Sequence, residues 1–394
     1  SRPGGFTWDV GVHYVGELEV PGLIRQALQV ATGGALQWAP MPRGYDVLRF
    51  PGFEFTVRVG EANYRAALEA AFPHERPAIA RYFRDLHRAA GWAPMLGLRG
   101  LAPRPVFALA RFFMQRGEAL VRMTTGQWLA QHVRDEKLKA VLAARWGDYG
   151  EPPRSSSFLT HAIVMRHYLE GAFYPVGGAG RIAQACQAVI EAAGGEVRVN
   201  SEVSEIVVEG GRAAGVRLKK TGQVLRAPAV ISNAGARATY LRLLAPEVVP
   251  FRDEIDQAPV SMGHVSLYLG FSESPAKAGA TAANCWAHGG LDHDRLFDRR
   301  NELLDAVVPH ASIFFPSLKD PAARVHTAEI IAPIDATAFA AWAGTRWMKR
   351  GAEYLALKEH LSDALLAFAE REFPGLFVAT PAPPSTAPRM RSGV

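Results

Sequence analysis

An α/β fold with two or more lobes is predicted by three features of the sequence. The chain has 394 residues, enough to bury a large core and to form more than one lobe. Apolar residues make up 48% of it and charged residues 21%, the ordinary balance of a globular protein. Residues 61–170 carry apolar side chains at helical spacing, whereas strand-like alternation comes before and after them.

The first elements expected are β-strands. Residues 6–16 are predicted to form a strand directly after Gly4 and Gly5. Because glycine has no side chain, this pair lets the backbone approach a ligand closely. Residues 45–59 alternate around a Pro-Gly pair, which predicts a β-hairpin.

A mainly helical lobe is expected next. Apolar spacing predicts helices over residues 62–72, 79–90, 106–116, 127–133, 138–146 and 158–169. A further helix over residues 181–193 is expected to stop at the two glycines that follow it.

The second half of the chain returns to short strands. They are predicted over residues 197–199, 203–208, 214–218, 224–227, 230–232, 265–271, 313–315 and 327–331, with a short helix over residues 237–244. A long amphipathic helix is predicted over residues 354–373. The proline-rich residues 381–394 have no periodicity and are predicted to form an unstructured tail.

Charge and cysteine content exclude several classes of protein. The net charge of +6 favours an acidic membrane surface or a phosphate-bearing ligand. The arginines are dispersed and no finger, homeodomain or RNA-recognition pattern occurs, so no nucleic-acid partner is expected. Cys186 and Cys285 are too few for a disulfide framework or a thiolate cage, and no metal is expected. No apolar run is long enough to span a bilayer.

Residues 92–117 combine apolar side chains with several arginines. A helix with an apolar face edged by arginines suits a membrane interface. A pair of helices facing the core explains the same pattern. The sequence leaves both interpretations open and slightly favours the second.

A glycine pattern stands at the start of the helix predicted over residues 181–193. Gly178, Gly180 and Ala183 fit the dinucleotide motif G-x-G-x-x-[GA]. That motif needs a buried strand ending at its first glycine, and Pro175 interrupts the strand here. A tight packing turn is therefore favoured over an independent nucleotide site.

Two segments suit a ligand at the end of an α/β sheet. Residues 231–235 end a predicted strand and open a helix, where such sheets place ligands. A plain turn capped by Asn233 is an equal alternative. Val203 lies in a strand whose backbone N–H and C=O groups would hydrogen-bond to the edge of an adenine if one lay beside it. His161 and His167 are placed on different helix faces by their spacing, which argues against a shared metal.

Four blocks of residues resemble the flavin-dependent phytoene desaturase superfamily, in the branch of the retinol saturases (all-trans-retinol 13,14-reductases) and carotenoid cis–trans isomerases. They are residues 3–14, 146–178, 232–235 and 315–354. The resemblance runs from about Pro3 to Pro381, and the second block is the most specific to this branch.

The resemblance implies an α/β architecture with an incomplete Rossmann-type FAD-binding domain and an inserted, partly helical substrate domain. Residues 1–45, 171–245 and 346–380 would form the FAD-binding parts. Residues 46–170 would form a mainly helical lobe that faces substrate and membrane. Residues 246–345 would form the sheet of the substrate domain, and residues 381–394 a disordered tail.

The same resemblance implies roles for particular residues. The FAD-binding residues would be Gly4, Gly5, Phe6, Val203, Asn233, Ala234 and Gly235. The substrate tunnel would be lined by Trp146, Gly147, Asp148 and Gly150. Tyr149 and His161 are the candidate catalytic acids.

The implied function is that of an FAD-dependent oxidoreductase. It would saturate, desaturate or isomerise conjugated C=C bonds of an apolar polyene, a retinoid or carotenoid, with an unspecified electron donor. A cytoplasmic location is expected, with peripheral membrane contact left open. The family's glycine-rich loop would precede Ser1 and its last FAD-contacting segment would follow Pro381. A truncated form that binds FAD weakly or not at all is therefore expected. A non-catalytic binder of an apolar ligand or membrane surface is the alternative, and an amine oxidase is less favoured.

Overall fold

The computed structural model describes residues 5–19, 22–95, 103–113, 115–258, 262–346 and 348–377. The chain divides into two compact units. The first contains Ser1–Cys186 and Met262–Val394, and the second contains Gln187–Ser261. Gly4 and the predicted tail over residues 381–394 lie outside the described residues.

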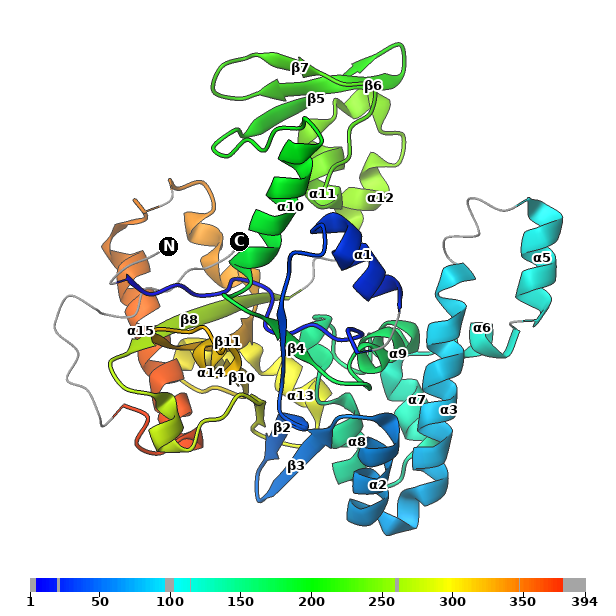
Figure 1. Ribbon diagram of the computed structural model, residues 1–394, viewed down its shortest axis with the longest axis vertical. Helices are drawn as coiled ribbons and strands as arrows, with labels where there is room; N and C mark the ends of the chain where they lie inside the picture. Colours follow the sequence, from blue (N-terminus) through cyan, green and yellow to red (C-terminus); the bar gives the residue numbers. More distant parts are fainter. Residues whose placement is uncertain are drawn as a thin grey trace. The chain divides into compact units, whose positions relative to one another are not determined.

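A six-stranded mixed sheet organises the first unit (Figure 1). Its order is β3 (Phe53–Arg58), β2 (Gly44–Phe50), β9 (Asn284–His288), β10 (His310–Phe314), β11 (His326–Ile334) and β8 (Gly263–Phe271). All neighbouring strands are antiparallel except β2 and β9, which are parallel. The hairpin predicted over residues 45–59 is confirmed, with Phe50 opposite Phe53 across its turn.

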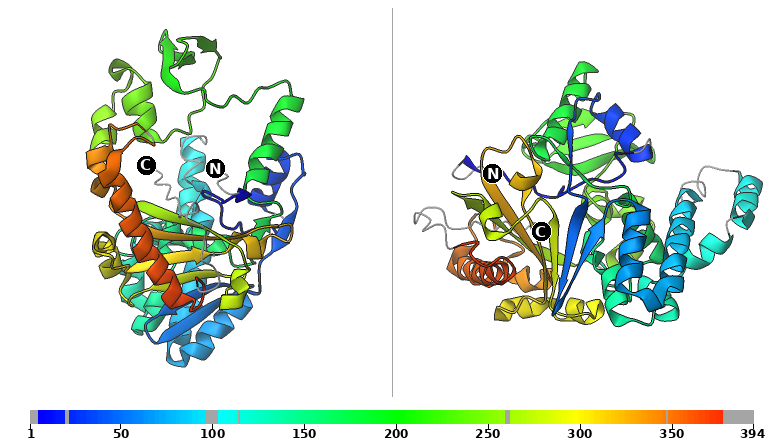
Figure 2. Two further views of the ribbon diagram at one scale, coloured as in Figure 1. Left: turned by 90° about the vertical axis from the view of Figure 1, so that its left-hand side faces the viewer. Right: turned by 60° about the horizontal axis from the view of Figure 1, so that its bottom comes forward.

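The C-terminal helix α15 (Gly351–Glu372) packs on part of this sheet. Figure 2 shows it running alongside the strands. Leu361, Leu365 and Phe368 are buried in one cluster with residues of β8, β10 and β11. The helix predicted over residues 354–373 is thus confirmed, because its apolar face meets the apolar face of these strands.

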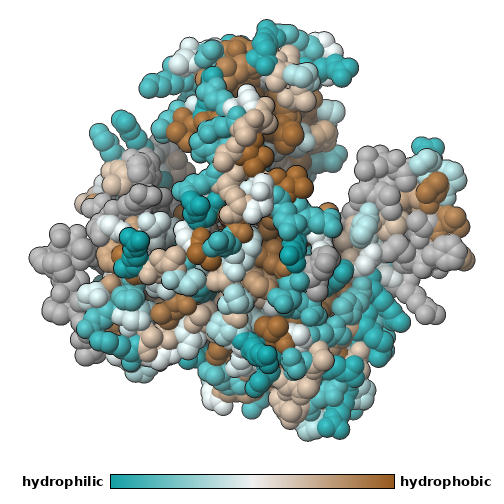
Figure 3. Space-filling model, viewed as in Figure 1, coloured by the Kyte–Doolittle hydropathy of each residue, from teal (hydrophilic) through white to brown (hydrophobic). Residues whose placement is uncertain are grey.

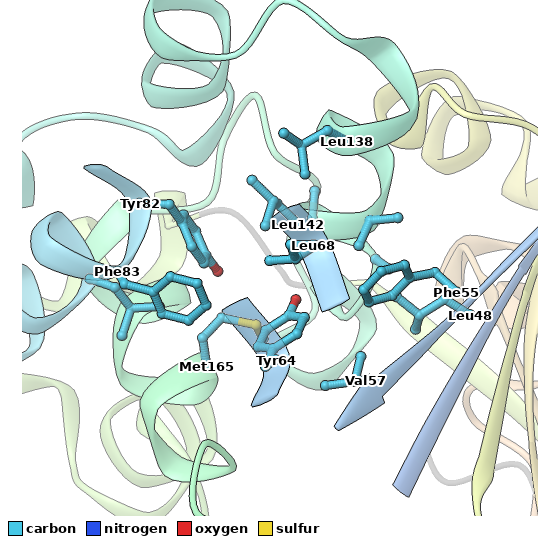
Figure 4. Packing of buried hydrophobic residues seen from close by; sticks show 14 of the residues in the cluster. Leu48, Phe55, Val57, Tyr64, Leu68, Tyr82, Phe83, Leu138, Leu142 and Met165 are labelled. Atoms are coloured by element: carbon cyan, nitrogen blue, oxygen red, sulfur yellow. The ribbon is translucent and has the colours of Figure 1, made fainter. Parts of the chain in front are cut away.

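A second core joins the hairpin to a helical layer (Figure 4). The helices that contribute to it include α2 (Glu61–Ala71), α3 (Arg76–Trp92), α7 (Thr125–His132), α8 (Glu136–Ala143) and α9 (Phe158–His167). In Figure 4 the side chains of Leu48, Tyr64 and Met165 come from β2, α2 and α9 into one cluster. The helices predicted in this region are confirmed, including α5 (Arg104–Phe113), which is followed by α6 (Gln115–Val121).

The strand predicted over residues 6–16 is wrong. This segment is a series of bends, and its one β-bridge joins Val15 to Phe173. Side chains hold it instead, since the Gly16 N–H donates to His167 Nε2 at 2.8 Å. After it come α1 (Leu23–Ala31) and the strand β1 (Trp38–Pro40), which pairs with β4 (Phe173–Pro175). The sequence patterns missed these three elements and β9.

The second unit holds a small antiparallel sheet of β5 (Val203–Glu209), β6 (Arg212–Leu218) and β7 (Val224–Arg226). It follows α10 (Gly180–Ala192), which begins in the first unit. A short α-helix, α11 (Ala236–Ala238), continues into a π-helical turn, and α12 (Arg252–Gln257) comes after them. The strands predicted over residues 197–199 and 230–232 are wrong, because neither segment pairs with a strand in the described part of the chain.

Candidate functional site

The segment after Gly5 runs beside open space. Gly5 has φ +81, and a Cβ added there would meet no described atom within 4 Å. Its neighbour Phe6 lies against Gly270 of β8, where an added Cβ would stand 2.9 Å from the Phe6 ring. Phe6 also stacks on Trp8, with 5.8 Å between the ring centroids. This backbone is therefore anchored on one side by Phe6 and accessible to a flat ligand at Gly5.

Carboxylates occupy the turn that leads into α10. Asp9 accepts hydrogen bonds from the Tyr174 hydroxyl and, at 2.9 Å, from the Ala179 N–H. The Gly177 N–H donates to Asp320 Oδ2 at 3.1 Å. A helix N-terminus attracts negative charge, and here the protein supplies that charge itself. This arrangement agrees with the packing-turn interpretation of the glycine pattern.

A buried acid faces His13 on the same segment. Glu329 of β11 has no exposed surface, and its Oε2 lies 3.1 Å from His13 Nδ1. The two atoms are at hydrogen-bond distance but not aligned, so neither Glu329 oxygen has a formed hydrogen bond from the described residues. Burial raises the pKa of Glu329 to about 8, and the nearby Asp9 carboxylate adds to this rise. The Glu329 carboxyl is thus protonated near neutral pH.

Lys319, on the short helix α14 (Pro316–Lys319), adds a cation beside this acid. Its Nζ donates to the His13 carbonyl at 3.0 Å and to Asn284 Oδ1 at 2.6 Å. Burial lowers the pKa of Lys319 to about 8. Burial also lowers the pKa of His13 to about 3, and Lys319 contributes to that fall. The His13 imidazole is therefore neutral at physiological pH.

A buried ion pair extends this network. Asp46 of β2 is fully buried and accepts from Arg145 Nη1 at 3.0 Å. Its other oxygen accepts from Asn284 Nδ2 at 2.8 Å. Since Asn284 also bonds Lys319, one continuous set of hydrogen bonds joins the helical layer to the sheet and the His13 segment.

The Trp146–Asp148 turn follows Arg145 directly. Trp146 is buried, and its indole N–H donates to His293 Nδ1 at 3.1 Å. Gly147 faces Trp286, with 3.5 Å between its would-be Cβ and that ring. Asp148 accepts from the Tyr14 hydroxyl at 3.4 Å. Asp148 is exposed at the pocket, and loss of part of its hydration there raises its pKa.

Tyr149 and His161 form a separate chain with Tyr82. The Tyr149 and Tyr82 hydroxyls lie 3.2 Å and 2.9 Å from the two ring nitrogens of His161. Burial, aided by Arg145, lowers the pKa of His161 to about 3. Both ring nitrogens have partners, as in a hydrogen-bonded core histidine. Gly150, the end of this block, is half-buried.

A pocket of about 310 Å³ lies where these groups meet the N-terminal segment. Its polar lining comes from His13, Tyr14, Glu17, Asp148 and His167, and its apolar lining from Ile24, Ile163, Val164 and Tyr168. Gly11 also lines it, and a Cβ added there would meet no described atom within 4 Å. Of the predicted catalytic and substrate residues, Asp148 alone is among the lining side chains. Pockets of this mixed character bind small apolar molecules that carry few polar groups.

The predicted cofactor residues of the second unit lie at an open edge and a turn. β5 is an edge strand of its sheet, so one side of the Val203 backbone lacks a partner strand among the described residues. Asn233, Ala234 and Gly235 are exposed, and Gly235 has φ +81. A Cβ on Gly235 would meet no described atom within 4 Å.

In the first unit the backbone at Gly5 is open to a ligand. In the second unit one edge of β5 has no partner strand among the described residues. These are the positions at which the predicted FAD contacts would lie. The described residues contain no group of three or more side chains placed to hold a metal ion. No helix among the described residues has the length and apolar character to cross a membrane.

Several residues of this network were not predicted from the sequence. Glu329 is a lone acid in the apolar strand β11, and Asp46 is a lone acid in the alternating strand β2. An acid inside an apolar strand is the signal that identifies such positions. His13, Arg145 and Lys319 stand within or beside the resembling blocks but were given no role.

Comparison with known proteins places this site in context. The sequence matches the family described as flavin containing amine oxidoreductase over residues 2–322. It is 28% identical over 400 residues to the all-trans-retinol 13,14-reductase of Macaca fascicularis, covering 94% of this chain and 65% of that protein. It is 26% identical over 391 residues to the chloroplastic prolycopene isomerase of Daucus carota, covering 94% and 60%. The chain thus spans less than two thirds of each relative's length.

A solved structure, an oxidoreductase from Methanosarcina mazei, has the same fold. It aligns with a TM-score of 0.57 at 15% identity, covering 92% of this chain and 72% of that one. Together with the mixed sheet and its helical layers, this similarity confirms the predicted fold class. The sequence relatives confirm the predicted resemblance to flavin-dependent polyene enzymes.

Proposed function

This chain belongs to the family of flavin-containing amine oxidoreductases, and we propose that it is an FAD-dependent oxidoreductase acting on conjugated C=C bonds of an apolar polyene. The substrate class is a retinoid or carotenoid, and the reaction is saturation, desaturation or cis–trans isomerisation. The pocket lined by Gly11 and His13 carries this proposal. It joins an apolar wall to several polar groups and to the open backbone of Gly11, which a flat ring can approach.

The chain's own residues would bind and orient the substrate. Ile24, Ile163 and Val164 give the polyene an apolar wall and limit the access of water. His13 and Asp148 provide polar groups at the same pocket. A bound flavin supplies the two-electron chemistry. Tyr149 and His161 were predicted as catalytic acids, but neither is among the residues that line the pocket. A double Tyr149→Phe, His161→Asn variant that converts the polyene as fast as the native chain would exclude this role.

The first test is flavin retention. The purified chain is mixed with FAD, freed of unbound cofactor and examined by visible absorption. The proposal requires a retained flavin band whose shape differs from that of free FAD, followed by conversion of retinol or a carotenoid under reducing conditions. A colourless protein that also fails to bind a polyene would contradict the proposal. A colourless protein that still binds a polyene would favour the alternative, a non-catalytic binder of apolar ligands.

The pocket itself can be blocked by one side chain. Gly11→Leu would place an apolar side chain in the pocket with little steric cost, so retinol binding, followed by tryptophan-to-retinol energy transfer, should be lost. Gly91→Leu on α3 is the matched control, because a Cβ there also meets no described atom within 4 Å but is outside the pocket. Equal binding by both variants would show that the polyene binds elsewhere.

We further propose peripheral contact with an anionic membrane through α5. Val106, Leu109 and Phe112 are 55%, 61% and 64% exposed and are spaced to share a helix face. Figure 3 shows apolar atoms on this part of the surface. The net charge of +6 favours an acidic bilayer. Such a contact would bring the chain to the lipid bilayer, in which apolar polyenes dissolve.

A further inference from the structure

The buried acid Glu329 and the pocket residue His13 are close enough to exchange a proton. They meet at 3.1 Å, and the His13 ring stacks on Phe314 with centroids 4.3 Å apart and planes 10° from parallel. The stack holds the ring with Nδ1 within 3.1 Å of the Glu329 carboxyl, so that a rotation of the carboxyl would align the two groups, while His13 itself lines the pocket. His13 thus connects a group hidden from solvent to the space where a substrate would lie.

We propose that His13 and Glu329 form the proton-donating pair of this site, in which Glu329 holds the proton and neutral His13 passes it to a substrate carbon. The inference rests on the proposed function and names the groups that would complete it. Saturation of a C=C bond needs a hydride, supplied by a reduced flavin, and a proton at the neighbouring carbon. The pair supplies the second of these.

The proton balance of this step is simple. The Glu329 O–H bond breaks as an N–H bond forms at His13 Nδ1, while the N–H bond at Nε2 breaks and a C–H bond forms on the substrate. His13 ends neutral in its other tautomer, and Glu329 ends as a carboxylate. A proton from water then restores the pair. Because His13 is neutral before and after, no imidazolium is formed inside the protein.

The surrounding charges suit this role. The titratable groups that face the pair are Asp9 on the same segment, Lys319 on α14, His264 on β8 and Tyr174 on β4. Burial and Asp9 favour the protonated form of Glu329, whereas Lys319 favours the carboxylate that the step leaves. These opposing effects leave the pKa of Glu329 at about 8, near the pH at which a general acid is most effective.

The pair can be tested without flavin by following the His13 tautomer. Histidine labelled with ¹⁵N reports which ring nitrogen carries the proton, and the His13→Asn variant assigns the signal. Below about pH 8 the Glu329 O–H should donate to Nδ1, so the proton on His13 sits at Nε2. Above that pH the carboxylate should accept from Nδ1–H, so the tautomer switches. Glu329→Gln should abolish the switch.

The matched control is Glu75→Gln. Glu75 is also buried, but it accepts from the Arg134 and Asp135 backbone N–H groups at 2.7 Å, away from the pocket. This variant should keep the His13 switch. A single His13 tautomer across the pH range, or a switch that survives in Glu329→Gln, would overturn the pair whether or not the chain binds flavin.

Turnover provides the second measurement. In flavin-loaded chain, Glu329→Gln should lower the rate of polyene reduction by about 100-fold or more and remove its decline above about pH 8. An unchanged rate and pH profile would overturn the proposal. A native chain that lacks flavin and activity but shows the tautomer switch would count against the proposed function while supporting the pair.

Discussion

The buried ion pair of Asp46 and Arg145 shows how single residues tie the candidate site to the fold. Arg145 immediately precedes the Trp146–Asp148 turn, and Asp46 bonds Asn284, which in turn bonds Lys319. Charges this deeply buried are costly unless they are paired and hydrogen-bonded. The pair therefore holds the turn in register with the sheet while adding little net stability of its own.

Breaking this pair should be strongly destabilising. Asp46→Asn leaves Arg145 buried without a counter-charge, and we expect the free energy of unfolding to fall by about 3–5 kcal/mol. Urea denaturation followed by tryptophan fluorescence measures the change. Asp298→Asn is the control, since Asp298 pairs with Arg154 at the surface, where such pairs contribute about 0–1 kcal/mol. Similar losses in both variants would argue against a special role for Asp46.

For single residues, the sequence identified segments that contribute to the site but did not identify which residues contact one another there. The block from Trp146 to Gly150 was singled out, and one of its members, Asp148, does line the pocket. Glu329 was included only as part of an expected strand. Its importance depends on His13, which lies more than 300 residues away in the chain and is brought near by the sheet. A local pattern carries no information about such a contact.

Among the elements, prediction succeeded where the period of apolar residues was long and regular. The helix over residues 354–373 and the hairpin over residues 45–59 carry their own signals, a helical period and a turn between alternating runs. Residues 6–16 alternate for another reason. Trp8 and Asp9 hydrogen-bond to other parts of the chain, His13 and Tyr14 line the pocket, and Val10 is 70% exposed, while only Val15 makes a β-bridge among the described residues.

The exposed face of α5 yields a prediction for an element. We expect the native chain to float with vesicles that contain anionic lipid, and less so with neutral vesicles or at high salt. A Val106→Glu, Leu109→Glu variant should weaken this binding by at least about tenfold, because burying one such side chain contributes about 1.5–3 kcal/mol. Leu355→Glu, at a 62% exposed leucine of α15, should not. Equal flotation of all three proteins would contradict the proposed contact.

For the whole first unit, the order of the strands in the sheet could not be predicted from local sequence patterns. β9 lies between β2 and β10, and its parallel pairing with β2 joins segments more than 200 residues apart. The sequence analysis missed β9 entirely. All five of its residues are buried, so it has no alternation of buried and exposed side chains to detect.

The interior of the first unit also holds several histidines that burial keeps neutral. Burial lowers the pKa of five histidines: to about 3 for His13, His161 and His310, to about 4 for His293, and well below its ordinary value of 6.5 for His288. His288 is stacked between Phe50 and His310, with centroids 4.9 Å and 4.4 Å away. Neither of its ring nitrogens has a hydrogen-bond partner among the described residues.

These histidines should make the fold sensitive to acid. Below pH 6.5 each binds a proton in the unfolded chain but not in the folded one, so stability falls as the pH falls, by about 1.4 kcal/mol per pH unit for each group. Asp148 and Glu329, whose pKa values are raised, act in the opposite sense, but the five histidines outnumber them. Urea unfolding between about pH 6.5 and 5 measures the slope.

One substitution separates the contribution of His288 from the rest. His288→Phe keeps an aromatic ring in the stack and removes a group that has no hydrogen bond to lose, so the fold should persist. The slope of stability against pH should then be shallower by about 1.4 kcal/mol per pH unit, because one fewer proton is taken up on unfolding. Phe50→Leu serves as the control, because it changes the same stack but removes no titratable group, and it should leave the slope unchanged. If His288→Phe also leaves it unchanged, His288 is already protonated in the folded protein, and the neutral stack inferred from its burial is wrong.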